Sequence, residues 1–361
     1  MRLLHRYVLR QWLATFLCTH AVLTCLLLLE DVYKNLEYFL KAKVTLAALA
    51  TYHAFLAASF FPLITPVAIF VSVLLSLGQL YGRNEITAMK SVGIHILEVC
   101  KPLAVSTAVL AAINLIFEAA VMPAATDYVA AFRTRTDAKI GYATVAKKIG
   151  FYNHRDNRIW CMKSLDKLSY EAKDVLISCY NESGQEELRI HAQAAKFLPV
   201  ENFWHFQNCS LTAFDTGTGS PKSVDLFTEK DFENFREHPK MIISSLKKTR
   251  DLSFHDVKTL LEYAGTDSVA NAFRVRFHGT FANAANCIIV MFLAIPFAVT
   301  GAKIKPLIRT AKACVFLLLF LVLDTLFALL GNGGVLSPAV AAWAANAVIL
   351  LPIAGLLRTA M

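Results

Sequence analysis

Six long apolar runs constrain the fold of this 361-residue chain more than any other feature. A segment needs about 18 or more apolar residues with few charges to cross the roughly 30 Å hydrocarbon core of a bilayer. All six runs meet this condition, which predicts a polytopic α-helical membrane protein with six transmembrane helices. The predicted spans lie near Gln11–Leu29, Ala54–Leu80, Leu103–Met122, Gly279–Ala302, Ala313–Leu330 and Val335–Leu357. No small-residue cleavage site follows Leu29, so the first run is expected to be a span and not a signal peptide.

The charge distribution predicts the orientation of these spans. Acidic and basic residues cancel between Pro123 and Ala270, so the net charge of +9 lies in the membrane part. If the spans alternate, one side carries Arg2, Arg6, Arg10, Arg83, Lys90, Lys101, Lys303, Lys305, Arg309, Lys312 and Arg358, against Lys34, Lys41, Lys43, Arg274 and Arg276 on the other. The positive-inside rule then places both termini in the cytoplasm and residues 123–270 in the periplasm. No basic cluster with interleaved aromatic residues indicates nucleic-acid binding.

The segment between the third and fourth spans shows short runs of alternating residues. Arg158–Leu165, Asp174–Cys179, Glu187–Phe197 and Phe203–Phe214 are separated by turn-forming residues, which predicts an antiparallel sandwich or open roll. A helix is predicted over Phe254–Tyr263, with Ser253 as its N-cap. Three cysteines lie in this domain, so at most one disulfide is expected there. They are Cys161, Cys179 and Cys209.

Several enzyme motifs are absent from the sequence. There is no CxxC pair, no HExxH zinc motif and no GxSxG nucleophile elbow. The phosphate-binding GxxxxGK[ST] pattern is also missing, and the nearest glycine-rich run, Gly217–Ser223, lacks the glycine before its lysine. We therefore expect no metal site, no cofactor and no nucleotide hydrolysis by this chain. An intramembrane enzyme is disfavoured, because no nucleophile–base pair is recognisable.

A charged, helix-like insert, Gly82–Pro102, separates the second and third spans. A short amphipathic helix on the cytoplasmic face is suited to docking against a soluble partner. Further motifs accompany it in a fixed order along the chain. They are RNEITAMKSVGIHILEVCKPL from Arg83, Pro62 and Pro66 in the second span, Glu118 and Pro123 closing the third, LAIPFAV (Leu293–Val299) in the fourth and SPAVAAWAAN (Ser337–Asn346) opening the sixth.

These motifs, with three spans on each side of a β-rich domain, resemble the lipopolysaccharide export permeases LptF and LptG over essentially the full length. The resemblance implies a permease subunit of an ABC transporter that works with a sister permease and a dimer of a cytoplasmic ATPase, which uses the ATP. It implies that lipopolysaccharide is extracted from the inner membrane and passed to periplasmic jellyroll bridge proteins. It also implies a periplasmic β-jellyroll domain at residues 123–270, between membrane parts 1–122 and 271–361, with a coupling helix at about 82–98.

Candidate residues of two kinds follow from the resemblance. In the family, the acidic residue of the RNE segment seats the coupling helix on the ATPase, which assigns that role to Glu85. An acid at this position also suits a helix N-terminus, and spacing alone does not separate the two roles. Arg83, Met89 and Val92 lie one or two helical turns away and complete the predicted docking set.

Basic residues after the first span contact lipid phosphates in the family, which points to Lys34 and Lys41. Arg133 and Arg135, after the third span, are further candidates. The alternative is that these are solvated charges, with the lysines, including Lys43, balanced by nearby acids. Those acids are Glu30, Asp31 and Glu37.

Polar residues inside spans are functional candidates, because burying them in lipid is costly. Asp324 lies in the middle of the fifth span, and either pairs with a cation of the sister subunit or forms a water-mediated or protonated contact with a neighbouring helix. Asn283 and Asn286 are expected to bond to neighbouring helices. Lone His20 is expected to serve packing.

Two other functions remain open from the sequence. One is a different ABC-type permease that transmits force to the periplasm without passing lipid. The other is a non-transporting envelope protein whose exported β domain binds a ligand. The sequence also leaves open whether the chain has the LptF-like or the LptG-like role.

Overall fold

The computed structural model describes residues 2–140, 145–246, 249, 252, 254–264, 268–299 and 306–360. The chain forms two compact units: a membrane unit, Met1–Val129 with Arg274–Met361, and a β unit, Ala130–Phe273. These divisions fall a few residues from the predicted ones at 122/123 and 270/271. Lys303 and Lys305, used above to predict the topology, and Ser253, the predicted N-cap, lie outside the described residues.

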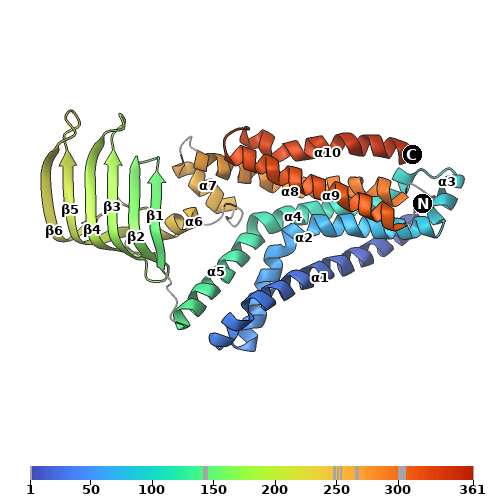
Figure 1. Ribbon diagram of the computed structural model, residues 1–361, viewed down its shortest axis with the longest axis horizontal. Coiled ribbons are helices and arrows are strands. Elements are labelled where there is room, and N and C mark those ends of the chain that lie inside the picture. The colour runs from blue at the N-terminus through green and yellow to red at the C-terminus, as the bar shows by residue number, and fades with distance from the viewer. Residues whose placement is uncertain are drawn as a thin grey trace. The chain divides into compact units, whose positions relative to one another are not determined.

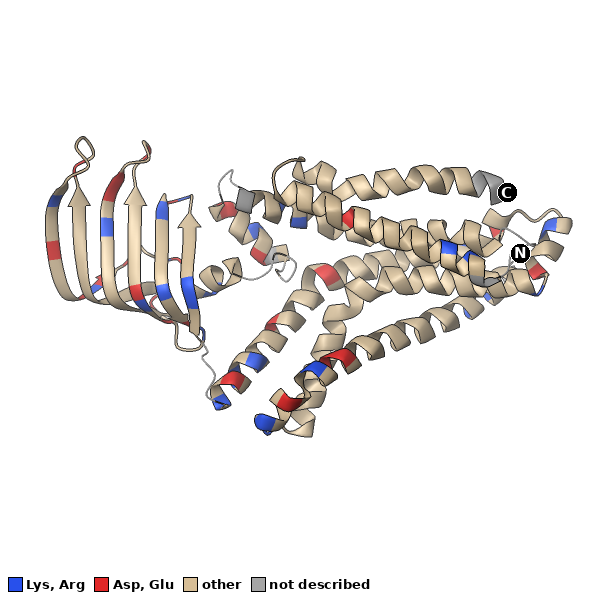
Figure 2. Cartoon of the chain, in the orientation of Figure 1, with Lys and Arg blue, Asp and Glu red and all other residues tan. Residues whose placement is uncertain are grey.

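The described part of the chain contains six helical segments that are long and apolar enough to cross a membrane, so the predicted number is confirmed (Figure 1). Five are the single helices α1 (Arg2–Lys41), α2 (Leu46–Gly82), α8 (Ser268–Val299), α9 (Pro306–Asn332) and α10 (Pro338–Ala360). The sixth joins α4 (Ile96–Ile116), the π-helical turn η1 (Phe117–Val121) and α5 (Met122–Lys139). Charged residues are sparse along these helices (Figure 2), as a hydrocarbon environment requires.

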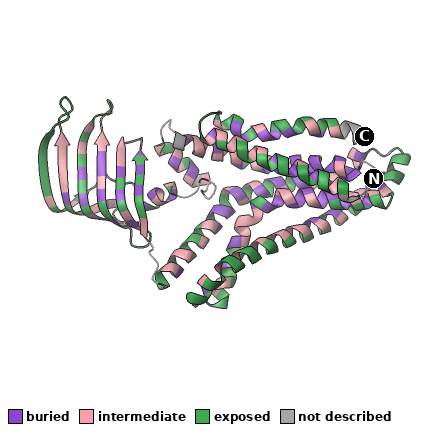
Figure 3. Cartoon of the chain, viewed as in Figure 1, coloured by how far each residue is buried: buried purple, intermediate pink, exposed green. Residues whose placement is uncertain are grey.

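The interior of the membrane unit is built mainly from α2 and α8. In the most apolar stretches of these two helices 61% and 72% of the residues are buried, against 11% in α1 and 17% in α9 (Figure 3). Phe70 and Leu77 of α2 pack in the same core as Met291 and Leu293 of α8. Helices α1 and α9 therefore present most of their apolar side chains outward.

The predicted coupling helix at 82–98 is shorter than expected. Helix α2 ends at Gly82, α3 spans only Glu85–Ser91, and α4 starts at Ile96. Asn84 and Gly93 have φ angles of +62° and +83°, in the left-handed region that interrupts a right-handed helix. Asn84 before α3 and Gly93 after it therefore interrupt the helix that was predicted to be continuous.

The β unit contains one six-stranded antiparallel sheet in the order β1-β2-β3-β4-β5-β6 (Figure 1). Four strands match the predicted segments: β2 (Arg158–Asp166), β3 (Glu171–Tyr180), β4 (Glu186–Leu198) and β5 (Phe203–Phe214). The polypeptide joins neighbouring strands in sequence order, so the described strands form an up-and-down open roll without the Greek-key crossings of a two-sheet jelly roll. The inserted antiparallel β domain is therefore confirmed. Of the two predicted arrangements, a sandwich and an open roll, the described strands form the open roll.

Both edge strands, β1 (Val145–Asn153) and β6 (Pro221–Phe232), were missed in the sequence. Strand β1 carries two adjacent lysines, Lys147 and Lys148, as its third and fourth residues, and β6 is exposed along most of its length. Neither strand therefore shows a clear alternation of apolar and polar residues, which is the signal used to predict strands. The predicted helix over Phe254–Tyr263 is confirmed as α7.

One face of the sheet carries the core of the β unit. Trp160 of β2, Ile177 of β3 and Ile190 of β4 are fully buried and pack with Phe235 and with Ile242 of the short helix α6 (Pro239–Ser245). Cys161, Cys179 and Cys209 are all free thiols. Burial raises the pKa of the Cys179 thiol to about 11, which makes it a poor nucleophile at neutral pH.

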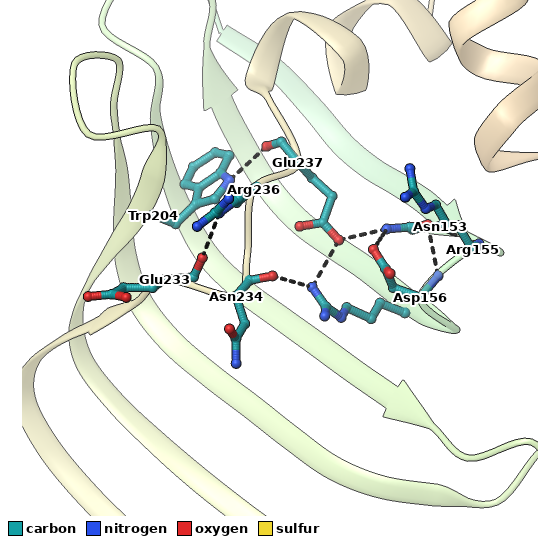
Figure 4. Close-up of polar contacts among 9 residues, drawn as sticks. Asn153, Arg155, Asp156, Trp204, Glu233, Asn234, Arg236 and Glu237 are labelled. Carbon is teal, nitrogen blue, oxygen red and sulfur yellow. Dashed lines mark hydrogen bonds and ion pairs between the residues drawn. The ribbon is translucent and has the colours of Figure 1, made fainter.

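A polar clamp holds the segment between β6 and α6 against this face (Figure 4). The Trp204 indole N–H donates to the Glu237 carbonyl oxygen at 2.8 Å. The buried Glu237 carboxylate accepts from Asn153 at 2.8 Å and from Arg158 at 3.3 Å. Arg158 also donates to the Asn234 carbonyl at 2.8 Å and lies over the Phe235 ring. The clamp thus connects β1, β2 and β5 through one returning segment.

We predict that Arg158→Met opens this clamp. Glu237 would lose one donor in its buried site, and breaking a buried ion pair costs about 3–5 kcal/mol. Amide hydrogen exchange in the full-length protein should accelerate in β1, β2 and the returning segment. Lys196→Met is the matched control, because its pair with Glu171 is about half exposed and contributes at most about 1 kcal/mol. Equal exchange in the two variants would contradict the prediction.

Candidate functional site

The first candidate site is the short helix α3 with the residues around it. Ile86 is fully buried and packs α3 into the core of the membrane unit. Glu85, the first residue of α3, is half-buried, and Met89 lies one turn further on and packs against the same core. Arg83 and Val92 are exposed, Val92 by 80%. The four predicted docking residues therefore divide into an inner pair, Glu85 and Met89, and an outer pair, Arg83 and Val92.

Glu85 has a partner that the sequence did not indicate. The Tyr7 hydroxyl, on α1, donates to Glu85 Oε2 at 3.0 Å. One turn further along α1, Gln11 donates to Gln79 of α2 at 3.3 Å. Tyr7 and Glu85 lie 78 positions apart, so no local pattern could have paired them.

The second candidate site lies at the other end of α1. Lys34 forms an ion pair with Glu30, and Lys41 forms one with Glu37 at 2.6 Å. Both lysines are more than half exposed, so these i,i+4 pairs contribute little to stability and leave the ammonium groups accessible. The prediction that nearby acids balance the lysines is therefore correct for Glu30 and Glu37.

Asp31, the third of the predicted balancing acids, has a different role. Its carboxylate accepts from Asn35 at 2.9 Å and from the Tyr52 hydroxyl at 3.4 Å, and lies 3.6 Å from His53. Asp31 and His53 are both largely buried between α1 and α2. This cluster fixes the hairpin that the two helices form, next to the exposed lysines.

The remaining basic candidates, Lys43, Arg133 and Arg135, do not lie on α1 beside Lys34 and Lys41. Lys43 is exposed in the turn after α1, with φ at +47°. On the part of α5 that belongs to the β unit, Arg133 is half-buried and Arg135 is exposed. The structure therefore brings Lys34 and Lys41 to one helix end, and it places the two arginines in the other unit.

A third site lies inside the membrane unit at the π-helical turn. Glu118 of η1 is 3% exposed and forms an ion pair with Arg276 of α8, whose side chain is 10% exposed. The same Glu118 oxygen, Oε1, accepts from Asn283 of α8 at 2.9 Å. π-Helical turns commonly occur at functional positions, and this one places a carboxylate between two helices. Asn283 therefore bonds to a neighbouring helix as predicted.

Asp324 does not join this ion pair. It is half-buried on α9 and forms no hydrogen bond or ion pair with the part of the chain that the structure describes. Glu118 is near enough to act on it electrostatically. Asn286 was predicted to bond to a neighbouring helix, but it donates to Asn283 at 3.4 Å within α8. His20 packs its ring against Phe61 with centroids 5.0 Å apart, in line with the predicted packing role.

The three sites contain no cluster that resembles a metal centre, and no group of three or more potential ligands occurs among the described residues. Their chemistry consists of hydrogen bonding, ion pairing and apolar contact.

Comparison with known proteins agrees with this chemistry. The family described as lipopolysaccharide export system permease LptF/LptG matches residues 6–359. The matched range includes the six candidate spans, the inserted sheet and all the candidate residues named above. No curated protein matches the chain individually.

We predict that Arg276→Met lowers the melting temperature of the purified protein in detergent. The substitution leaves the Glu118 carboxylate buried without its cation, at a cost of about 3–5 kcal/mol. Combining Arg276→Met with Glu118→Leu should recover most of the loss, because replacing both partners by apolar residues is often neutral. Arg274→Met is the control for removing a nearby arginine outside this pair. A double variant as unstable as the single one would contradict the structural role of the pair.

Proposed function

Because the chain belongs to the LptF/LptG family of lipopolysaccharide export permeases, we propose that it extracts lipopolysaccharide from the inner membrane by coupling to a cytoplasmic ABC ATPase. Family membership makes the chain a multi-pass inner-membrane transport subunit, not an enzyme, within the Lpt ABC transporter. In the proposal, a sister permease completes the membrane part and an ATPase dimer supplies the chemistry. Both termini lie in the cytoplasm, as the distribution of basic residues predicts.

The family match over residues 6–359 is the observation that carries the proposal. It extends across both groups of spans and the inserted β unit. A chain matched only in the spans would leave the exported domain without an assigned role.

In the proposed cycle, α3 docks into a groove of the ATPase. Arg83 and Val92 supply exposed contacts, and Glu85 supplies a carboxylate at the helix start. A carboxylate facing a basic groove forms charge-assisted hydrogen bonds, which are among the stronger polar contacts in proteins. ATP-driven closure of the motor would move α3 and bring the two permeases together. Cargo moves only if its affinity differs between the open and closed states.

The lipid phosphates are proposed to bind Lys34 and Lys41, and Arg133 and Arg135 on α5 are kept as separate candidates for lipid-phosphate contacts. Lys34 already forms an ion pair with Glu30, and Lys41 forms one with Glu37. A phosphate would have to displace Glu30 or Glu37, and weak, exposed ion pairs permit this exchange. Lysine is suited to phosphate because it acts as a point charge.

The β unit is proposed to receive the lipid and pass it to periplasmic bridge proteins of similar fold. Strand β6 supports this step, because it pairs only with β5 among the described strands and exposes Leu226 by 80%. An edge strand with free backbone groups can pair with a strand of another protein.

We predict that Glu85→Arg reduces co-purification of the ATPase with the tagged protein from native membranes. Loss of a charge-assisted hydrogen bond, together with reversal of the charge, should weaken the association about tenfold or more. Mass spectrometry of the purified complex provides the readout, with membrane insertion measured in parallel. Glu182→Arg, the same substitution in an exposed turn of the β unit, is the control.

Unchanged co-purification in Glu85→Arg would remove Glu85 from the docking site. The wild-type preparation tests the wider proposal. Recovery of ATPase without lipopolysaccharide would favour a permease that only transmits force, and absence of any ATPase would favour the envelope-binding alternative.

We predict that Lys34→Gln and Lys41→Gln each lower the amount of co-purifying lipopolysaccharide, by about threefold. Glu30→Gln is the matched control, because it removes the carboxylate that competes with phosphate for Lys34 and should leave lipid binding unchanged or increased. The loss should shrink at high salt, since exposed charges are screened. Equal lipid binding in Lys34→Gln and wild type would remove Lys34 from the phosphate site.

A further inference from the structure

Helix α1 is attached to the rest of the membrane unit along one narrow stripe. Val8, Trp12 and Phe16 recur every fourth residue and are 1%, 0% and 4% exposed. Leu13 and Leu17, on the other side of the helix, are 43% and 58% exposed. The stripe fixes the rotation of α1 about its axis, and thereby the position of Tyr7 beside Val8.

Next to this stripe, Tyr7 of α1 contacts α3. The Tyr7 hydroxyl lies 3.0 Å from Oε2 and 3.4 Å from Oε1 of Glu85, so the single O–H is shared by both carboxylate oxygens. Gln11, one turn further along α1, bonds to Gln79 on α2. Side-chain hydrogen bonds thereby link α1 to both α3 and the end of α2, whose bonded residues lie 78 and 68 positions further along the chain, at one end of the membrane unit.

Helix α3 has few other attachments. It is seven residues long and lies between backbone turns at Asn84 and Gly93. Its single buried residue is Ile86. The Tyr7 contact is directional and has a charged acceptor, which makes it stronger than a hydrogen bond between neutral groups.

We propose that Tyr7 is a positioning residue that connects the first span to the ATPase-docking helix, so that displacement of α3 is transmitted to α1. This inference rests on the proposed function, since it assumes that the ATPase moves α3. Through Tyr7 the motor acts directly on a helix whose apolar side chains are mostly exposed. Without Tyr7, force from α3 reaches α1 indirectly, through α2 and α4, which flank α3 in the chain and pack against α1.

The test compares wild type and Tyr7→Phe in the intact complex, reconstituted with lipopolysaccharide in proteoliposomes. Two rates are measured on each sample: ATP hydrolysis, and lipopolysaccharide transfer to the bridge protein. Tyr7→Phe keeps the ring and removes only the hydroxyl that bonds to Glu85. Tyr128→Phe is the matched control, because its ring stacks on Phe55 at 4.1 Å and its hydroxyl bonds to no residue that the structure describes.

Tyr7→Phe should retain the ATPase at wild-type amounts and release about threefold less lipid per ATP hydrolysed. A merely structural role would not change this ratio, because loss of folded complex lowers both rates in proportion. The effect should shrink in a Glu85→Gln background, where the acceptor has lost its charge. Such non-additivity is the signature of two residues that act through each other.

Three outcomes would overturn the inference. They are an unchanged ratio of lipid to ATP, a proportional fall in both rates, and loss of ATPase binding equal to that in Glu85→Arg, which would make Tyr7 part of the docking surface. All three leave the proposed function intact. Failure of the wild-type complex to contain an ATPase would instead refute the proposed function, and the two failures are therefore distinguishable.

Discussion

Water is absent from the hydrocarbon core of a bilayer, so each backbone N–H and C=O group of a spanning segment must find its partner within the protein. This requirement forces the six apolar runs into helices and confines irregular backbone to their ends. The turns at Asn84 and Gly93, which delimit α3, occur between spans. The same requirement explains why the β unit is inserted between the third and fourth spans, outside the apolar segments.

Charge is tolerated inside the membrane unit where it is paired. Glu118 and Arg276 neutralise one another between η1 and α8, with Asn283 as a third partner. Asp324 has no such partner among the described residues and lies on α9, a helix that is largely exposed. Glu118 and Asp324 therefore differ: the first is neutralised inside the membrane unit, and the second is not paired by any described residue.

The β unit follows a similar principle with different chemistry. Its sheet has one apolar face, and the segment after β6 returns across that face through Trp204, Arg158 and Glu237. Strand β6, at one edge of the sheet, is exposed along most of its length. The β unit thus combines one covered face with an exposed edge strand.

Local features of the sequence by themselves determined the number of spans, four of the six strands and the position of α3. Apolar length and alternation depend on neighbouring residues, and both can be read directly from the chain. Only the tertiary structure decided the pairs Tyr7–Glu85, Arg158–Glu237 and Glu118–Arg276, whose members lie 78, 79 and 158 positions apart. Such pairs leave no periodic signal, because each partner is placed by the packing of its own helix or strand. The edge strands β1 and β6 were missed for a related reason: they are strands because a neighbour pairs with them, not because their own residues alternate.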